Sequence, residues 1–361
     1  MTARERFLRT MNYEAVDRPL VIALEPFEAA GIRRWRREGL TAEQPPAQAL
    51  GMDWLELVPL SFSPLPDWEY RVVAEDEEYI TAVGWLGATV RRRKDEPEMY
   101  YGHVDHAIKT RQDWEQCKWR FRADAPERQP ADLEALAARL AQSEQPVGLH
   151  IFPFFFRLAF YLMGMERFMT AFYEEPELIH DMFSFWGEFV LATLRPVLGK
   201  VARGDARLDF VTFAEDLAYK QATHISPRIY EEFWLPYQDP IVEALHAAGV
   251  PVVCMWTAGN AAPLLPLMLD HGINCTWPLE RAAGMDPPAL RAQFGKELRL
   301  GGGVPKEALI AGPAAIDREI EHLRPLMAAG GYVPALDDMV PPEVGLETYR
   351  YYLEKMREIR L

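Results

Sequence analysis

The sequence predicts an α/β protein folded as one (β/α)8 TIM barrel, and three observations lead to this prediction. Short runs rich in apolar and β-branched residues alternate with amphipathic stretches, which is typical of a parallel sheet with helices outside it. Eight such runs are present, and eight parallel strands close a barrel. No Gly-x-Gly-x-x-Gly motif follows the first run, which disfavours the alternative of an open doubly wound sheet.

The predicted strands are spread over the whole chain. They lie at 20–24, 55–58, 147–151, 208–215, 252–256, 273–277, 298–302 and 332–336. Helical spacing of apolar residues predicts helices at 261–271, 287–294 and 314–329. Ser226 and Pro227 mark a further helix start, because serine caps helix N-termini and proline favours the first helical position.

Residues 61–145 interrupt the alternation of strands and helices. Two β-rich runs at 70–73 and 80–90 predict a β-hairpin, with glycines marking its bend. No low-complexity linker separates this segment from its surroundings. We therefore expect a single domain over residues 1–361, with an insertion after strand two that covers one rim of the barrel.

Composition narrows the classes of partner. The formal net charge is −15, which disfavours nucleic acid and anionic membranes as partners. No apolar run approaches the roughly 20 residues that a transmembrane helix needs. Cys117, Cys254 and Cys275 are far apart and form no Cys-x-x-Cys pair, which favours free thiols in a reducing compartment. We expect a soluble, cytoplasmic protein that binds a small molecule.

Carboxylates gather where the predicted strands end, which is where barrel enzymes carry their active sites. Acids placed close together raise one another's pKa values, which suits acid–base chemistry, a bound cation or a metal. The alternative for each acid is that it caps a helix or pairs with a base such as Arg157. The six acids are Glu25, Glu215, Asp216, Glu280, Asp337 and Asp338.

Aromatic and basic side chains accompany these acids. Arg157 and Tyr161 follow the strand at 147–151, and Trp256 ends the strand at 252–256. Tyr219 adds a further aromatic wall. His150 lies within a strand, which favours a core histidine over a catalytic one. No His-x-x-x-His, His-Glu-x-x-His or His-x-Cys pair is present, so the motifs give no support for a zinc site, while a metal bound by the carboxylates stays open.

Segments along the whole chain resemble the uroporphyrinogen decarboxylase superfamily, which includes corrinoid-linked methyltransferases. The similarity covers the opening Arg-Glu-Arg-Phe-Leu-Arg-Thr-Met-Asn-Tyr with Asp-Arg-Pro, Leu-Ala-Phe-Tyr-Leu-Met-Gly at 158–164, and Glu-Asp-Leu-Ala-Tyr with Ile-Ser-Pro at 215–227. It continues through Gly259 and Asn260, and through Gly-Gly-Tyr-Val-Pro with Asp-Asp-Met-Val-Pro-Pro at 330–342. The resemblance implies the same barrel, and it implies that Tyr161 is a substrate-site tyrosine.

Departures from the family pattern shape the functional expectation. The decarboxylase signature Arg-Gln-Ala-Gly-Arg, whose arginines bind the acidic arms of a porphyrinogen, has only a faint counterpart at 29–34. The histidine usual near the end of strand eight is replaced by Asp338. Methyltransferases of the superfamily hold zinc with His-x-Cys-Gly, but Trp256, Thr257, Ala258 and Gly259 stand there, so we expect no thiolate-type zinc site.

Three hypotheses remain open. The first is an enzyme that passes a methyl group from a small methylated substrate to a corrinoid protein, its required partner. The second is a decarboxylase of a carboxylic acid, of the uroporphyrinogen type or another. The third is a non-catalytic homologue that binds a small molecule. The resemblance is compatible with a homodimer, and no tightly bound cofactor is expected.

The same residues are candidates under the first two hypotheses. We expect catalytic roles for Tyr161, Glu215, Asp216, Asp337 and Asp338. We expect substrate contacts from Glu25, Arg157, Tyr219, Trp256, Asn260 and Glu280.

Overall fold

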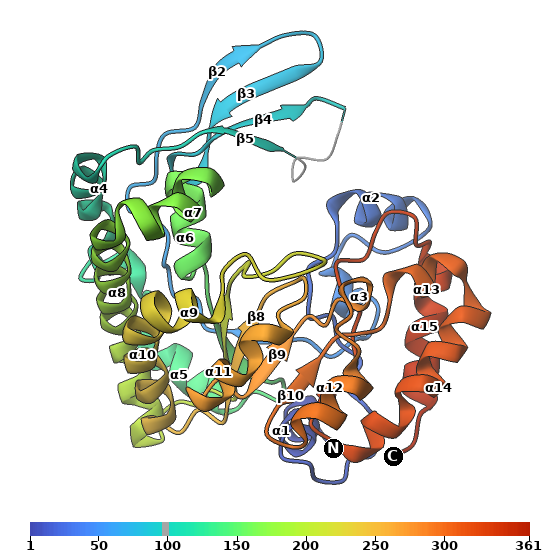
Figure 1. Ribbon diagram of the computed structural model, residues 1–361. Coiled ribbons are helices and arrows are strands. Elements are labelled where there is room, and N and C mark those ends of the chain that lie inside the picture. The colour runs from blue at the N-terminus through green and yellow to red at the C-terminus, as the bar shows by residue number, and fades with distance from the viewer. Residues whose placement is uncertain (96–100) are drawn as a thin grey trace.

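A curled, seven-stranded parallel sheet forms the centre of the molecule (Figure 1). The structure is a computed structural model, and it describes residues 1–95 and 101–361. The strand order is β1-β6-β7-β8-β9-β10-β11, and each neighbouring pair is parallel. The strands are β1 (Glu56–Leu57), β6 (Val147–Ile151), β7 (Phe210–Ala214), β8 (Val252–Trp256), β9 (Cys275–Trp277), β10 (Arg299–Gly301) and β11 (Tyr332–Val333).

Seven of the eight predicted strands are therefore present, and the strand predicted at 20–24 is wrong. Its residues still enter the interior of the sheet, where Leu20 and Ile22 are buried beside Phe210. The physical reason lies in the hydrogen bonds of Val21. Its N–H donates to the side chain of Asp53 (3.0 Å) and not to a strand carbonyl. The described residues thus form a curled α/β sheet of seven strands, and the eighth strand of the predicted barrel is not among them.

Helices cover the outside of the sheet (Figure 1). The predictions at 287–294 and 314–329 are confirmed, and the one at 261–271 is shorter and starts with a 3-10 turn, η5 (Ala262–Leu264). The helices are α1 (Ala3–Met11), α2 (Ala29–Arg37), α3 (Pro46–Ala49), α4 (Arg111–Cys117), α5 (Leu133–Ala141), α6 (Phe155–Met163), α7 (Met165–Glu174), α8 (Pro176–Arg203), α9 (Pro227–Ile229), α10 (Leu235–Ala247), α11 (Leu265–Asp270), α12 (Pro287–Phe294), α13 (Lys306–Ala311), α14 (Pro313–Ala329) and α15 (Leu346–Glu358).

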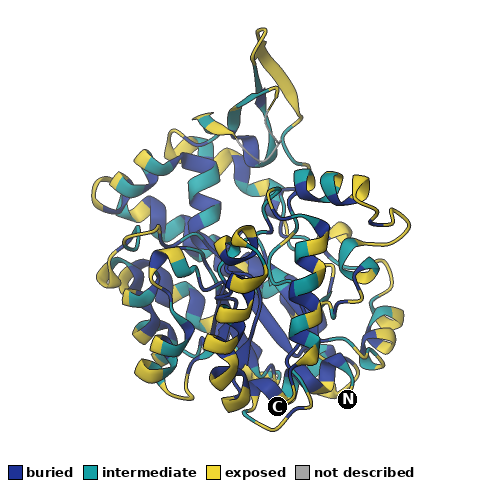
Figure 2. Ribbon diagram, turned by 90° about the vertical axis from the view of Figure 1, so that its right-hand side faces the viewer, coloured by how far each residue is buried: buried dark blue, intermediate teal, exposed yellow. Residues whose placement is uncertain are grey.

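Two apolar clusters hold the layers together. The smaller lies inside the curl of the sheet and includes Phe7, Phe210, Cys254 and Trp277. The larger lies between the sheet and the helices. Figure 2 shows buried strands in the centre and exposed residues on the outer faces of the helices. Gly148 leaves room for the ring of Phe210, because a Cβ atom there would lie 2.1 Å from the ring.

The inserted segment forms a second, antiparallel sheet of four strands, in the order β2-β3-β4-β5. The predicted hairpin is confirmed as part of it, but the sequence did not indicate β5. Both Figures 1 and 2 place this sheet at the opposite end of the molecule from the two termini, and Figure 1 shows it next to α6 and α7. The strands are β2 (Arg71–Glu75), β3 (Tyr79–Val83), β4 (Thr89–Arg93) and β5 (Gly102–Asp105), with the turn η1 (Trp85–Gly87) between β3 and β4.

Among the described residues, no helix combines the length and the apolar character that crossing a lipid bilayer requires.

Candidate active site

Glu25 is the centre of a cluster at the carboxyl ends of the strands. Its carboxyl group accepts a hydrogen bond from the indole N–H of Trp256, the last residue of β8. Burial raises the pKa of Glu25 to about 8. The negative charge of Asp338 raises it further, while Trp256 and the positive charge of Arg157 lower it. Glu25 therefore carries its proton at neutral pH and can donate it.

Arg157 brings a positive charge to the same cluster. Its guanidinium lies over the Trp256 ring, 4.7 Å from the ring centroid, and 5.4 Å from the centroid of Phe152. Its Nε donates to the backbone carbonyl of Glu215 (3.1 Å), and a terminal nitrogen lies 3.9 Å from Asp216. Aromatic faces attract a cation in this geometry, so the two rings hold Arg157, and no described carboxylate lies closer to it than Asp216.

His150 lies beneath these rings in an uncharged form. Its Nδ1 is 2.6 Å from the hydroxyl oxygen of Thr212, and its ring stacks on Phe152. Burial lowers the pKa of His150 to about 4, and the charge of Arg157 acts in the same direction. This histidine is a neutral part of the floor of the cluster.

Glu215 does not face the open mouth, because its side chain is fully buried and its oxygens are occupied. They accept from the backbone N–H groups of Phe156 (2.8 Å) and Arg157 (3.2 Å), and from the indole of Trp234 (2.9 Å). Burial raises the pKa of Glu215 to about 7, although these hydrogen bonds lower it. Its contacts hold the start of α6, the helix that carries Arg157 and Tyr161.

Asp337 follows β11 and, like Glu215, is a buried carboxylate that accepts hydrogen bonds from backbone N–H groups. It is 1 % exposed and accepts from the backbone N–H groups of Arg281 (3.1 Å) and Lys306 (2.9 Å). Burial raises the pKa of Asp337 to about 6. The carboxylate thus joins the loops that follow β9, β10 and β11.

Asp216 and Asp338 remain at the rim with partly exposed side chains (45 % and 38 %). Asp338 forms an ion pair with Lys306, and it also accepts from the backbone N–H of Met339 (2.7 Å). Sequence reasoning missed Lys306. Its position at the end of the loop after β10 was a signal that could have found it.

Three further candidates, Tyr219, Asn260 and Glu280, shape the loops after β7, β8 and β9. Glu280 accepts from the N–H of Gly259 (2.9 Å), and the N–H of Asn260 donates to the carbonyl of Tyr219 (2.9 Å). Gly259 has φ +75°, and a Cβ atom there would lie 2.6 Å from the backbone of Ala218, so glycine is required. The Tyr219 ring is half exposed and lies 5.2 Å from that of His224.

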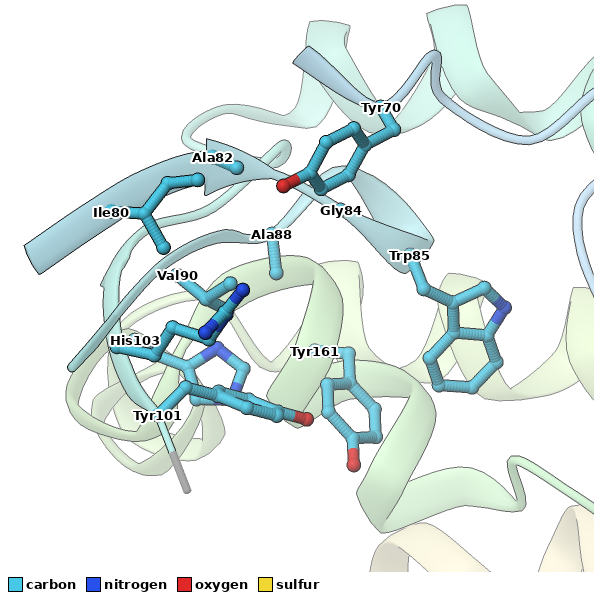
Figure 3. Close-up of a pocket in the computed structure, with 11 residues that line it drawn as sticks. Tyr70, Ile80, Ala82, Gly84, Trp85, Ala88, Val90, Tyr101, His103 and Tyr161 are labelled. Carbon is cyan, nitrogen blue, oxygen red and sulfur yellow. The ribbon is translucent and has the colours of Figure 1, made fainter. Parts of the chain in front are cut away.

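Tyr161 lies apart from the Glu25 cluster. Its ring faces a hollow between α6 and the antiparallel sheet (Figure 3), and it meets the ring of Trp85 edge-on at 5.1 Å. Trp85 in turn stacks on Phe152 at 5.2 Å. Since Phe152 also lies under Arg157, this stack connects the hollow to the Glu25 cluster.

The donor set does not fit a thiolate zinc ion. Trp256 and Ala258 stand where the zinc motif needs histidine and cysteine, and the Trp256 indole is bound to Glu25. Within residues 1–95 and 101–361, no three His, Cys, Asp or Glu side chains are grouped as metal ligands. We therefore derive no catalytic step through a metal.

Comparison with known proteins identifies the family. A solved structure of a methyltransferase from Methanosarcina mazei matches with a TM-score of 0.63 and 16 % identity, over 99 % of this chain and 99 % of that one. At this identity the likeness shows the fold alone. No curated protein sequence matches. The family model of uroporphyrinogen decarboxylase (URO-D) matches residues 120–359, which is more than half of the chain but leaves out Glu25 and the antiparallel sheet. The chain belongs to the uroporphyrinogen decarboxylase family.

Proposed function

We propose that this protein is an enzyme that transfers a methyl group from a small methylated substrate to a corrinoid protein. One observation carries the proposal: the carboxyl group of Glu25 is buried at the strand ends, bonded to the indole N–H of Trp256, and this burial raises its pKa to about 8. A general acid is most effective when its pKa lies near the working pH, and a pKa of about 8 meets this condition.

The acid assists departure of the atom X that carries the methyl group. The methyl group leaves without the bonding electrons, the electron pair stays on X, and Glu25 delivers a proton to X. The carboxylate that results is stabilised by the Trp256 indole N–H and by the charge of Arg157. A corrinoid on a partner protein would supply the methyl acceptor, and the partly exposed rim at Asp216 and Asp338 would be the side from which that protein approaches.

The charges at the rim disfavour an anionic substrate, and the proton from Glu25 requires a lone pair on X, so a neutral substrate fits this reaction. Lys306 is already paired with Asp338, and Arg157 is held by two rings and faces Asp216. Glu215 and Asp337 act as positioning residues in this proposal, since their oxygens hold backbone N–H groups.

A second candidate function is decarboxylation, and the weak pairing of Arg157 favours it. The 3.9 Å separation from Asp216 leaves the guanidinium able to hold a substrate carboxylate. Loss of carbon dioxide from a second carboxylate leaves a carbanion, and Glu25 would protonate that carbon. Both candidate reactions therefore use the same proton donor.

A direct assay distinguishes these functions. The full-length protein is incubated with methyl-labelled amines or methyl ethers and reduced cobalamin, and methylcobalamin is followed by its absorbance. We expect labelled methylcobalamin from the wild type and at least about a hundredfold slower formation with Glu25→Gln, because general acid catalysis contributes on that scale. Glu231→Gln, on an exposed part of the π-helical turn η4 (Tyr230–Trp234), is the matched control and should react normally.

Other outcomes select the alternatives. Release of labelled carbon dioxide from carboxylic acids, lost in Glu25→Gln, would establish the decarboxylase. A ligand that raises the thermal midpoint without any turnover would establish the non-catalytic homologue. Full activity of Glu25→Gln in either assay would rule out the proposed proton donor.

A further inference from the structure

A hollow outside the Glu25 cluster lies between α6 and the antiparallel sheet (Figure 3). Its volume is about 440 Å³, which lies within the range of small-molecule sites. Most of its lining comes from the inserted segment, from residues 70–92 and from Tyr101 and His103, and Tyr161 contributes the wall on α6. None of the roles assigned above to the Glu25 cluster uses it.

Strand register explains why the hollow exists. Ile80 pairs with Arg92 and Ala82 pairs with Val90, so all four side chains share one face of the β3–β4 sheet. His103 of β5 pairs with Val90 and joins the same face. The small side chain of Ala82 leaves the middle of this face unfilled, and Gly84 and Ala88 extend the space toward the turn.

Aromatic rings form the walls of the hollow. Figure 3 shows Trp85, Tyr101 and Tyr161 around it, with the hydroxyl group of Tyr101 directed toward Tyr161. One face of Trp85 is already covered by Phe152, with the ring centroids 5.2 Å apart. Rigid, flat walls of this kind favour a flat ligand, because aromatic groups pack best by stacking and edge contacts.

Arg92 is the one charged side chain among the described residues that line the hollow, since burial lowers the pKa of His103 and keeps it neutral. Arg92 is half-buried and makes one long hydrogen bond, to the carbonyl of Arg93 (3.4 Å), with no ion pair to any described residue. Its neighbour Arg91 points to the opposite face, where it lies over Tyr79 and 3.5 Å from Asp76.

We propose that this hollow binds a planar aromatic carboxylate, whose ring lies among Trp85, Tyr101 and Tyr161 and whose carboxylate binds Arg92. The Arg92 guanidinium, which forms no ion pair with a described residue, offers a carboxylate two parallel N–H groups, and this is the strongest match available among the described lining residues. The site does not depend on the proposed methyl transfer, because none of its contacts involves Glu25.

Isothermal titration calorimetry with 2-naphthoate tests the site, with 2-naphthamide as the uncharged molecule of the same shape. We expect the wild type to bind naphthoate at least about tenfold more tightly than naphthamide, because hydrogen bonds to charged groups exceed neutral ones by this order. Arg92→Gln should weaken naphthoate binding at least about tenfold. Arg91→Gln, one residue away on the outer face, is the matched control and should bind like the wild type.

Two further measurements keep the result independent of folding and of the proposed catalysis. Thermal midpoints identify any variant that fails to fold, and the comparison of the two ligands needs the wild type alone. Glu25→Gln should bind naphthoate like the wild type, even if it is inactive. The proposal is overturned if the wild type does not bind naphthoate, if naphthamide binds equally well, or if folded Arg92→Gln retains full affinity.

Discussion

At the scale of single residues, Glu25 couples the chemistry of the site to pH. Its pKa is raised from 4.5 to about 8 by burial and by Asp338. The folded protein therefore favours the protonated group, and this contribution to stability is complete below pH 4.5 and lost as the pH rises toward 8. We expect the free energy of unfolding to fall by at most about 1.4 kcal/mol per pH unit in that window.

Urea unfolding at pH 5 and pH 8.5 measures this effect, with Glu25→Gln as the comparison. The variant carries no titrating group at this position, so its stability should depend less on pH than that of the wild type. Turnover should also fall as the pH passes about 8, since the proton donor is then lost. An identical pH dependence in both proteins would contradict the raised pKa.

Glu215 has a structural role that single substitutions expose. Glu215→Ala leaves the N–H groups of Phe156, Arg157 and Trp234 without acceptors in a fully buried place. An unsatisfied buried donor costs about 1–3 kcal/mol, so we expect a loss of at least about 3 kcal/mol in the free energy of unfolding. Denaturant titration measures it. Asp338→Asn, at the partly exposed rim, should change stability by less than about 1 kcal/mol.

At the scale of elements, close packing between β6 and β7 depends on Gly148. A Cβ atom at Gly148 would lie 2.1 Å from the ring of Phe210, inside the curl of the sheet. Gly148→Ala should therefore destabilise the protein by about 1–3 kcal/mol, the usual cost of overpacking a core. A double-mutant cycle with Phe210→Leu checks the cause. If the clash is responsible, the smaller side chain recovers part of the loss, and additive effects would argue against it.

Two of the predicted strands show how much of the secondary structure can be predicted from the sequence. The run at 252–256 coincides with β8, because a short apolar run flanked by helices has few other structures available. The run at 20–24 has the same character but forms no strand, since Val21 bonds to Asp53, 32 positions further along the chain. Such a contact between distant residues leaves no mark on local periodicity.

For the candidate site, the sequence predicts which residues lie at the strand ends but does not predict where their side chains point. Strand-end positions brought Glu25, Arg157, Trp256 and Asp338 to one cluster, as a parallel sheet requires. Position along a strand does not tell which way a side chain turns, and the buried Glu215 turns toward backbone N–H groups instead. Tyr161 faces the inserted sheet for the same reason, because the packing of α6 decides its direction.

At the scale of the whole molecule, one apolar cluster joins the insertion to the rest. It runs from Val21 to Ile359 and includes Leu86 and Trp114 of the inserted segment. Because these residues lose their packing together, we expect a single heat-absorption peak on unfolding. Differential scanning calorimetry tests this expectation. Two well-separated peaks would show that the insertion unfolds as a unit of its own and would contradict the single domain.

The hydrogen bonds accepted by Asp337 also limit how far the rim loops can vary in length. The loops after β9 and β10 must each present one backbone N–H, at Arg281 and at Lys306, to the same carboxylate. Residues inserted between a strand end and its N–H would pull that contact apart. Beyond Arg281 the constraint ends, and Gly284 has open space around it. Grafted segments or affinity tags are therefore best placed at the Gly284 turn, where added residues leave the hydrogen bonds between Asp337 and the loops after β9 and β10 intact.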